Sequence, residues 1–272
     1  MPVVRRVDPH ERIERILDWA MPICIGILAI AGWFAVVHIN DIPHYVLPGP
    51  DLVGGSLWND WSTLIDSWWV TIKVCVLALG LAVAGGVGLA MLFTLSRWIG
   101  RSFYPYAVIL QVTPVVAIAP LIIIYVDNLF IVLLICAWLV AFFPILSNTT
   151  QGLNSADHNL LNLFQMCGAN KWQVFRLLRI PGAMPYFLTG FRISGGLALI
   201  GAIVAEFVAG TAGSGSGLAY RILESGYRLN IPRMFAALIM ISVTGILIFA
   251  VTSFISHLVL HRWHESAIRR EN

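Results

Sequence analysis

Three charged side chains interrupt otherwise apolar runs, and they are the first candidates for chemistry. Lys73, Arg192 and Glu206 each lie in a segment rich in valine, isoleucine, leucine and alanine. A charge at the centre of a bilayer costs about 2.5–3.5 kcal/mol on insertion scales, so such a residue usually faces a cavity, a partner or the interface. These residues therefore predict either a path for a solute or fixed contacts between helices.

The alternatives for each charge follow from its position. Lys73 lies early in its apolar run, where it either reaches the outer interface or gives a cavity a positive charge that suits an anion. Glu206 either lines a translocation path or is held by hydrogen bonds from the backbone of the loop after it. Arg192 is expected near the inner interface, where it either extends its charged end to the interface or contacts the loop that precedes its run.

Prolines at 114, 120 and 144 interrupt two further apolar runs. A proline in a membrane helix frees a carbonyl group and bends the axis, and freed backbone at membrane depth is tolerated only where it meets protein or a cavity. The polar side chains beside these breaks either line a path or bond neighbouring helices. The candidate path residues are Gln111, Thr113, Asn148, Glu206 and Lys73.

Enzymatic chemistry finds little support in the sequence. The run GSGSG at 213–217 is not the hydrolase motif Gly-x-Ser-x-Gly, because Gly215 stands at its centre, and nothing orients His257 as a base. A phosphate-binding loop ends in Gly-Lys-Ser/Thr, yet neither Lys73 nor Lys171 follows a glycine. No catalytic residue, cofactor or metal site is expected, and the four cysteines have no paired spacing.

The composition is that of a membrane protein. The 272 residues are 58% hydrophobic and only 11% charged, with a mean hydropathy of +0.82, whereas a soluble domain is about 45–50% apolar and about 25% charged. The net charge of +3 is small, so a nucleic-acid partner is not expected. The chain is predicted to be all-α and polytopic.

Six runs are long enough to cross a bilayer, since a hydrocarbon core of about 30 Å needs roughly 20 apolar residues in a helix. We expect 1–18 to be a retained N-terminal segment and 19–272 to be one transmembrane domain without a separate soluble part. The predicted spans are 19–39, 68–95, 103–126, 129–149, 183–210 and 235–260. An even number of spans places both termini on one side.

The arginines and lysines of the short loops predict which side that is. With the N-terminus inside, only Arg221, Arg228 and Arg233 would face the other side, as cytoplasmic loops retain basic residues. We therefore expect both termini in the cytoplasm, the N-in/C-in topology. The loop at 155–181 is then cytoplasmic.

That loop is predicted to hold two short helices. The first is capped by Asn154 or Ser155 and ended by Gly168, and the second runs from about Asn170 to Leu178. Pro181 and Pro185 are expected to prevent it from continuing into the fifth span. The apolar faces with a basic rim fit either a groove on a soluble partner or the membrane surface.

The loop sequence GANKWQVFRLLRIPGAMPYFLTGFRISGG resembles the cytoplasmic signature of permease subunits of bacterial ATP-binding-cassette (ABC) importers. That signature has a Glu-Ala-Ala triplet, a glycine four residues after the second alanine, and Ile/Leu-Pro about a dozen residues later. Gly168 and Pro181 match, whereas Asn162, Leu163 and Phe164 replace the triplet. The runs LQVTPVVAIAPLIIIY, FFPILSNTTQGL and IVAEFVAGTAGSGSGLAY are similar to the branch that imports nitrate, sulfonates, taurine and bicarbonate. The resemblance extends from about 47 to 263.

The resemblance implies a type I importer permease in the bacterial inner membrane, which moves a small and anionic solute by alternating access. Two ATPase subunits would bind ATP and dock on the loop, a second permease copy would complete the path, and a periplasmic or lipid-anchored binding protein would deliver the solute. The alternative is a channel or ion-coupled carrier that works without an ATPase. The residues expected to contact the ATPase are Leu163, Phe164, Gly168, Ala169, Trp172, Phe175, Arg176 and Pro181.

Overall fold

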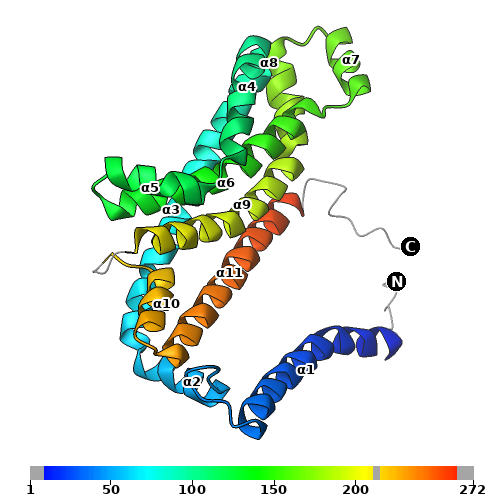
Figure 1. The fold of residues 1–272 in the computed structure, drawn as a ribbon. Coiled ribbons are helices and arrows are strands. Elements are labelled where there is room, and N and C mark those ends of the chain that lie inside the picture. Colours follow the sequence, from blue (N-terminus) through cyan, green and yellow to red (C-terminus); the bar gives the residue numbers. More distant parts are fainter. Residues whose placement is uncertain (1–8, 211–214, 262–272) are drawn as a thin grey trace.

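The computed structural model describes residues 9–210 and 215–261, and this part of the chain is built from helices alone (Figure 1). The predicted all-α fold is therefore confirmed. Five helices are long and apolar enough to cross a membrane, and a sharply bent pair makes up to six. The helices are α1 Pro9–Ile39, α2 Pro50–Asn59, α3 Trp61–Leu95, α4 Arg97–Val112, α5 Val115–Tyr125, α6 Leu129–Asn154, α7 His158–Met166, α8 Lys171–Val174, the π-helical η1 Phe175–Arg179, α9 Ile180–Ala209, α10 Leu218–Tyr227 and α11 Ile231–Leu260.

The third predicted span is wrong as a single helix. The run 103–126 falls into α4 and α5, whose axes differ by 97°. Thr113 ends α4 in an extended conformation and Pro114 precedes the first residue of α5. Proline disfavours the helical conformation of the residue before it, which explains the position of the break.

The predicted stop before the fifth span is also wrong. A single helical rod runs through α8, η1 and α9 from Lys171 to Ala209. In η1 the backbone widens to a π turn, in which the Ile180 amide donates to the Phe175 carbonyl five residues earlier. Pro181 follows at the first turn of α9, where a missing amide hydrogen costs little, so the chain continues without a break.

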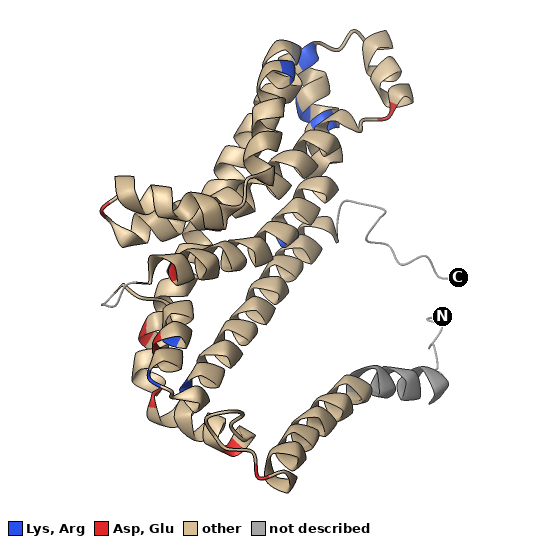
Figure 2. Cartoon of the chain, in the orientation of Figure 1, with Lys and Arg blue, Asp and Glu red and all other residues tan. Residues whose placement is uncertain are grey.

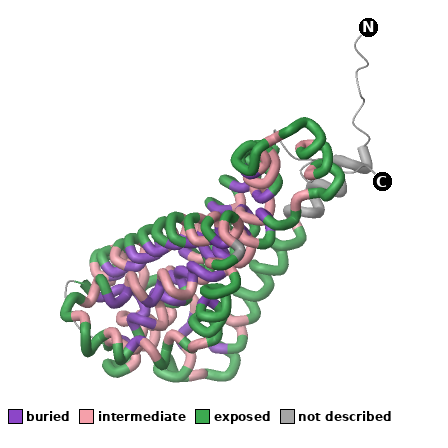
Figure 3. Tube along the Cα trace, turned by 90° about the horizontal axis from the view of Figure 1, so that it is seen from above, coloured by how far each residue is buried: buried purple, intermediate pink, exposed green. Residues whose placement is uncertain are grey.

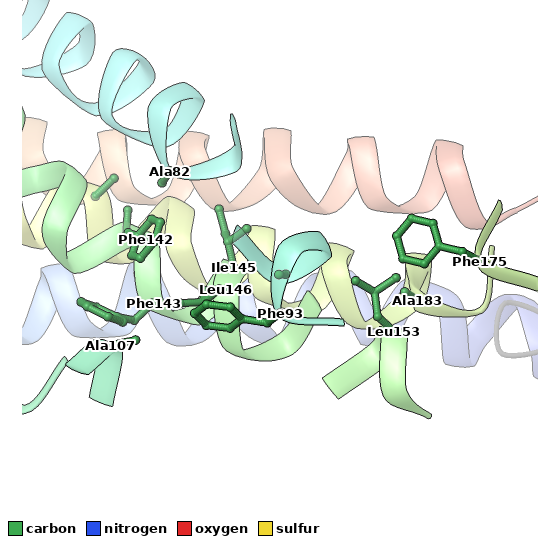
Figure 4. Packing of buried hydrophobic residues seen from close by; sticks show 13 residues of the cluster. Ala82, Phe93, Ala107, Phe142, Phe143, Ile145, Leu146, Leu153, Phe175 and Ala183 are labelled. Atoms are coloured by element: carbon green, nitrogen blue, oxygen red, sulfur yellow. The ribbon is translucent and has the colours of Figure 1, made fainter. Parts of the chain in front are cut away.

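The centre of the bundle is the packing of α6 against α3 and α9. Small residues let the backbones approach, as the run 80–90 of α3 predicts: Ala82 and Ala90 are fully buried, and Gly86 lies against Ile145 and Leu146. Figure 4 shows Ala82, Ile145 and Leu146 near the rings of Phe142 and Phe143 of α6. Viewed along the molecule, buried residues gather inside the bundle and exposed residues cover its outside (Figure 3).

Two glycines of α9 provide a matched test of this packing. A Cβ at Gly190 would lie 2.6 Å from the Pro144 carbonyl oxygen of α6, whereas a Cβ at Gly196 would meet nothing within 4 Å. We expect Gly190→Ala to lower the free energy of unfolding by about 1–3 kcal/mol, because overpacking forces backbone shifts. Gly196→Ala should be neutral or slightly stabilising, and thermal unfolding of the two variants in detergent measures the difference. Equal melting temperatures would contradict the close approach of α6 and α9.

Helix α1 stands away from the bundle (Figure 1). Most of its described side chains are exposed, and its ring contact with the bundle is that of Trp33 with Phe235 of α11, at 6.0 Å between centroids. In a membrane these apolar faces meet lipid or another subunit.

Candidate functional site

The two ends of the bundle differ in structure and in charge. One end carries α7 and α8, and we call it the loop end; the opposite end carries α2 and α10 (Figure 1). The loop end carries mostly lysine and arginine, whereas the other end carries most of the aspartate and glutamate together with further arginines (Figure 2). The candidate coupling residues lie in α7, the turn after it, α8, η1 and the first turn of α9, so they share the loop end.

At the loop end, the short helix α7 is capped at both ends. Its N-cap is Asp157, whose side chain accepts a hydrogen bond from the Asn159 amide, so the predicted caps Asn154 and Ser155 are wrong. Asn154 instead ends α6. The expected turn at Gly168 is confirmed, with a φ of +70°, and the Ala169 amide donates to the Phe164 carbonyl. This is the hydrogen-bond pattern that closes a helix with a left-handed glycine.

The second turn of the loop begins with a capping box. The Asn170 side chain accepts from the Gln173 amide, and the Gln173 side chain accepts from the Asn170 amide, both at 2.8 Å. These reciprocal bonds fix the start of the rod relative to Gly168. The geometry of the loop is thus set by its own backbone and caps.

The other predicted coupling residues differ in where they lie and how exposed they are. Leu163, Phe164 and Ala169 line a groove of about 250 Å³ between α7 and η1, together with Cys167, Gln173 and Leu177. Trp172 is 59% exposed and Arg176 is exposed beside the groove. Phe175 points inward and is buried, although its ring stacks with Trp172 at 5.8 Å.

Pro181 lies apart from that groove. It lines a separate apolar cavity of about 490 Å³ between the start of α9 and the end of α11, with Leu177, Met184 and Val259 among its walls. The structure therefore assembles most of the predicted coupling residues at one surface, with Phe175 and Pro181 beneath or beside it. We call the surface formed by Leu163, Phe164, Ala169, Trp172 and Arg176 the coupling surface.

Among the predicted path residues, only Gln111 and Thr113 share a cavity. This path cavity, of about 380 Å³, lies where α4 breaks into α5 and faces α6 and α9. Its walls include Pro114, Pro144 and Gly201. The Thr113 hydroxyl donates to the Ile109 carbonyl at 2.8 Å. No acidic or basic side chain lines the cavity among the described residues.

The other three predicted path residues lie elsewhere. Asn148 donates from its amide to the Pro144 carbonyl at 2.8 Å, within α6. Lys73 is exposed, and its ammonium group lies 5.4 Å from the centroid of the Trp69 ring. Arg192 does not reach the loop; it donates to the Ser256 hydroxyl of α11 at 3.0 Å.

Glu206 occupies a closed site near the end of α9, where it is 3% exposed. One carboxyl oxygen accepts from the Thr71 hydroxyl at 2.9 Å and the other from the Ala219 amide at 2.7 Å. The Thr71 oxygen in turn accepts from the Leu218 amide at 3.0 Å. This arrangement corresponds to the second alternative for Glu206, which is bonding to the backbone of the following loop.

Thr71 and Gly217 were not singled out by sequence reasoning. A Cβ at Gly217 would overlap the Glu206 carboxyl group, so only glycine fits there. Thr71 is a single hydroxyl residue in the apolar run of α3. Its position two residues before Lys73 was the only feature of the sequence that could have marked it as a site residue. Ser214 of the GSGSG run lies outside the described residues.

The far end of α10 carries an ionic cluster. Glu224 accepts from Arg221 at 2.8 Å and pairs with Arg228 at 3.0 Å. Arg221 also donates to the Ser67 hydroxyl of α3 at 2.7 Å. The hydrogen bond from Arg221, helped by the charges of Arg221, Arg228 and Arg233, lowers the pKa of Glu224. The cluster holds α10 against α3.

The hydrolase alternative has no geometric support. His257 is exposed near the end of α11, a helix of about 45 Å, whereas Leu218, the neighbour of Gly217, packs with Ala236, Ala237 and Ile241 in the first half of that helix. Within the described residues, no group of three or more histidine, cysteine, aspartate or glutamate side chains could hold a metal ion. Cys75 and Cys136 are buried, whereas Cys24 and Cys167 are exposed.

Comparison with known proteins connects this arrangement to a family. Residues 82–263 match the model of the binding-protein-dependent transport system inner membrane component. The riboflavin transport system permease protein RibX of Chloroflexus aurantiacus is 31% identical over 97% of this chain and 98% of its own length. The putative aliphatic sulfonates transport permease protein SsuC of Bacillus subtilis is 27% identical over 84% of this chain and 82% of its own.

A solved structure shares the fold. The inward-facing MetNI methionine ABC transporter aligns with a TM-score of 0.60 at 16% identity, over 72% of this chain and 96% of the chain compared. The long family match and the full-length relative decide the assignment. The chain belongs to the binding-protein-dependent transport system inner membrane components and is a multi-pass, non-catalytic permease subunit of a bacterial ABC importer in the inner membrane.

Proposed function

We propose that two copies of this chain form the path of an ATP-driven importer, with the loop end facing the cytoplasm. An ATPase subunit docks on each loop, and a periplasmic or lipid-anchored binding protein docks on the α10 end. The basic residues at the loop end support this orientation. ATP binding and hydrolysis by the partner subunits then move the loops and alternate the access of the path.

The observation that carries this proposal is the rod from Lys171 to Ala209. Its first turn, with Trp172 exposed, lies on the coupling surface. Its far end reaches Glu206 and α10. A helix transmits displacement along its axis because its backbone hydrogen bonds resist stretching. A force applied to the loop therefore reaches the opposite end of the same element.

The solute we propose is uncharged and heteroaromatic rather than the anion expected from the sequence. Lys73 contacts Trp69 and Arg192 bonds Ser256, so these two cations contact protein groups away from the path cavity. The cavity itself offers apolar walls with Gln111 and Thr113 as polar groups. An amide side chain can pair with a ring amide or imide, which a flavin-like solute carries. Riboflavin, named for a full-length relative, is the first solute to test.

The docking surface is tested with two exposed tryptophans. Trp172 is 59% exposed on the coupling surface, and Trp98 is 82% exposed at the start of α4, outside the loop. We expect Trp172→Ala to weaken binding of the partner ATPase subunit at least about tenfold, since aromatic anchors contribute 2 kcal/mol or more at interfaces. Trp98→Ala should bind normally, and co-purification with a titration in detergent measures both. If wild-type permease transports in vesicles without the ATPase, the carrier alternative holds instead.

The solute class is tested by uptake. Proteoliposomes with the permease, the ATPase and the binding protein should accumulate labelled riboflavin only with ATP. A labelled aliphatic sulfonate should not accumulate above the no-ATP background. Preference for the sulfonate would contradict an uncharged solute and support the anionic solute expected from the sequence.

A further inference from the structure

The start of α10 lacks a cap of its own. Gly217 is the N-cap residue and has no side chain to accept a hydrogen bond. The first amide groups of a helix have no partner within the helix and need one from outside. In this structure the partners come from two other helices: Thr71 of α3 receives the Leu218 amide and Glu206 of α9 receives the Ala219 amide.

Glu206 and Thr71 are also bonded to each other, through the Thr71 hydroxyl at 2.9 Å. Both side chains are buried, at 3% and 0% exposed, so water does not compete for these bonds. Gly217 closes the site, because any side chain there would displace the carboxyl group. We call Glu206 and Thr71 the α10 clamp.

The α10 clamp acts at the end of the rod that begins in the coupling surface. Glu206 lies within the last turn of α9, whose C-cap is Gly210. A second hydrogen bond fixes α10 further along its length: Arg221 of α10 donates to Ser67 of α3, which lies one turn before Thr71. α10 is thus bound to α3 and α9 through side chains from both.

We infer that Glu206 and Thr71 are positioning residues for transport: the α10 clamp makes α10 move with the rod, so that the state of the coupling surface reaches the opposite face. This inference rests on the proposed function. It assigns to the buried carboxyl group a task between helices instead of contact with the solute. The clamp would keep the α9–α10 distance constant while the rest of the bundle rearranges.

The first test measures coupling in the reconstituted complex of permease, ATPase and binding protein. We expect Glu206→Gln and Thr71→Val each to lower the stimulation of ATP hydrolysis by loaded binding protein about tenfold, since each removes a buried hydrogen bond. Basal hydrolysis and assembly should stay at the wild-type level. The control is Thr94→Val, because the Thr94 hydroxyl on the same helix bonds only to the Ala90 carbonyl of its own turn.

The double variant separates a joint role from two independent ones. Residues that act through one interaction are not additive, so Glu206→Gln combined with Thr71→Val should lose no more stimulation than either alone. Additive losses would overturn the clamp as a unit.

The second test follows the helices directly. Nitroxide labels are placed at Phe207 on α9, which is 38% exposed, and at Tyr227 on α10, which is 86% exposed, in a background without the native cysteines. The distance distribution should be the same without nucleotide and with trapped ATP in the wild-type permease. In Glu206→Gln it should match wild type without nucleotide and lengthen with ATP, which a purely structural defect would not produce.

The outcomes separate this inference from the proposed function. If the wild-type complex takes up solute only with ATP but Glu206→Gln keeps full stimulation and a constant distance, the clamp is wrong and the proposed function stands. If the wild-type complex shows no ATP-dependent uptake of either labelled solute, the proposed function fails and the clamp with it.

Discussion

Replacing Gly168 with valine is expected to weaken binding of the ATPase subunit about tenfold or more. Gly168 has a φ of +70°, and a left-handed conformation costs an L-residue roughly 1–2 kcal/mol, with β-branched residues worst. A side chain there would meet nothing within 4 Å, so any effect comes from the backbone. The strain would unwind the turn and separate α7 from the capping box at Asn170.

The matched control is Gly168→Asn. Asparagine enters the left-handed region more readily than other residues, and the site is open, so this variant should bind within about threefold of wild type. Titration of the ATPase against each detergent-purified permease measures both. Equal affinity of the valine and asparagine variants would show that the shape of this turn does not matter for docking.

Replacing Gln111 with lysine has the second large expected effect. Gln111 is a polar wall of the path cavity at the break between α4 and α5. An added charge at membrane depth costs about 2.5–3.5 kcal/mol, which corresponds to roughly a hundredfold at 1.4 kcal/mol per tenfold change. ATP-dependent uptake of riboflavin in proteoliposomes should fall by that order.

Two variants control this result. Gln111→Met keeps the volume and loses the amide, so uptake should fall about tenfold if the amide bonds the solute. Ile109→Lys places the same charge about 3 Å away along α4, at an exposed position outside the cavity walls. It should leave uptake unchanged. A rise in sulfonate uptake with Gln111→Lys would instead support an anionic solute.

The resemblance to the family, as distinct from the assignment, rested on residues close together in the sequence. The turn at Gly168 and its distance to Pro181 needed no knowledge of the fold, because a left-handed glycine is a local property of the chain. The long apolar runs likewise predicted most of the membrane helices, and the small residues around Gly86 predicted close helix packing, since each depends on composition within one segment.

Two errors in the predicted helix boundaries arose at prolines. Pro114 bends the third span by 97°, whereas Pro181 is absorbed by a π turn in a continuous rod. The sequence shows a proline in both places. Whether the helix breaks depends on what the neighbouring helices allow and on whether the preceding turn can widen, which no local pattern records.

The sequence by itself determined that this chain is an all-α membrane permease with a turn at Gly168, because hydrophobicity and backbone preference are properties of each residue. Only the tertiary structure decided what the polar residues inside the bundle do. It joined Glu206 to Thr71 and the start of α10, and it placed Gln111 and Thr113 in one cavity. A polar group in an apolar run must find a partner, but which partner depends on contacts between segments far apart in the chain.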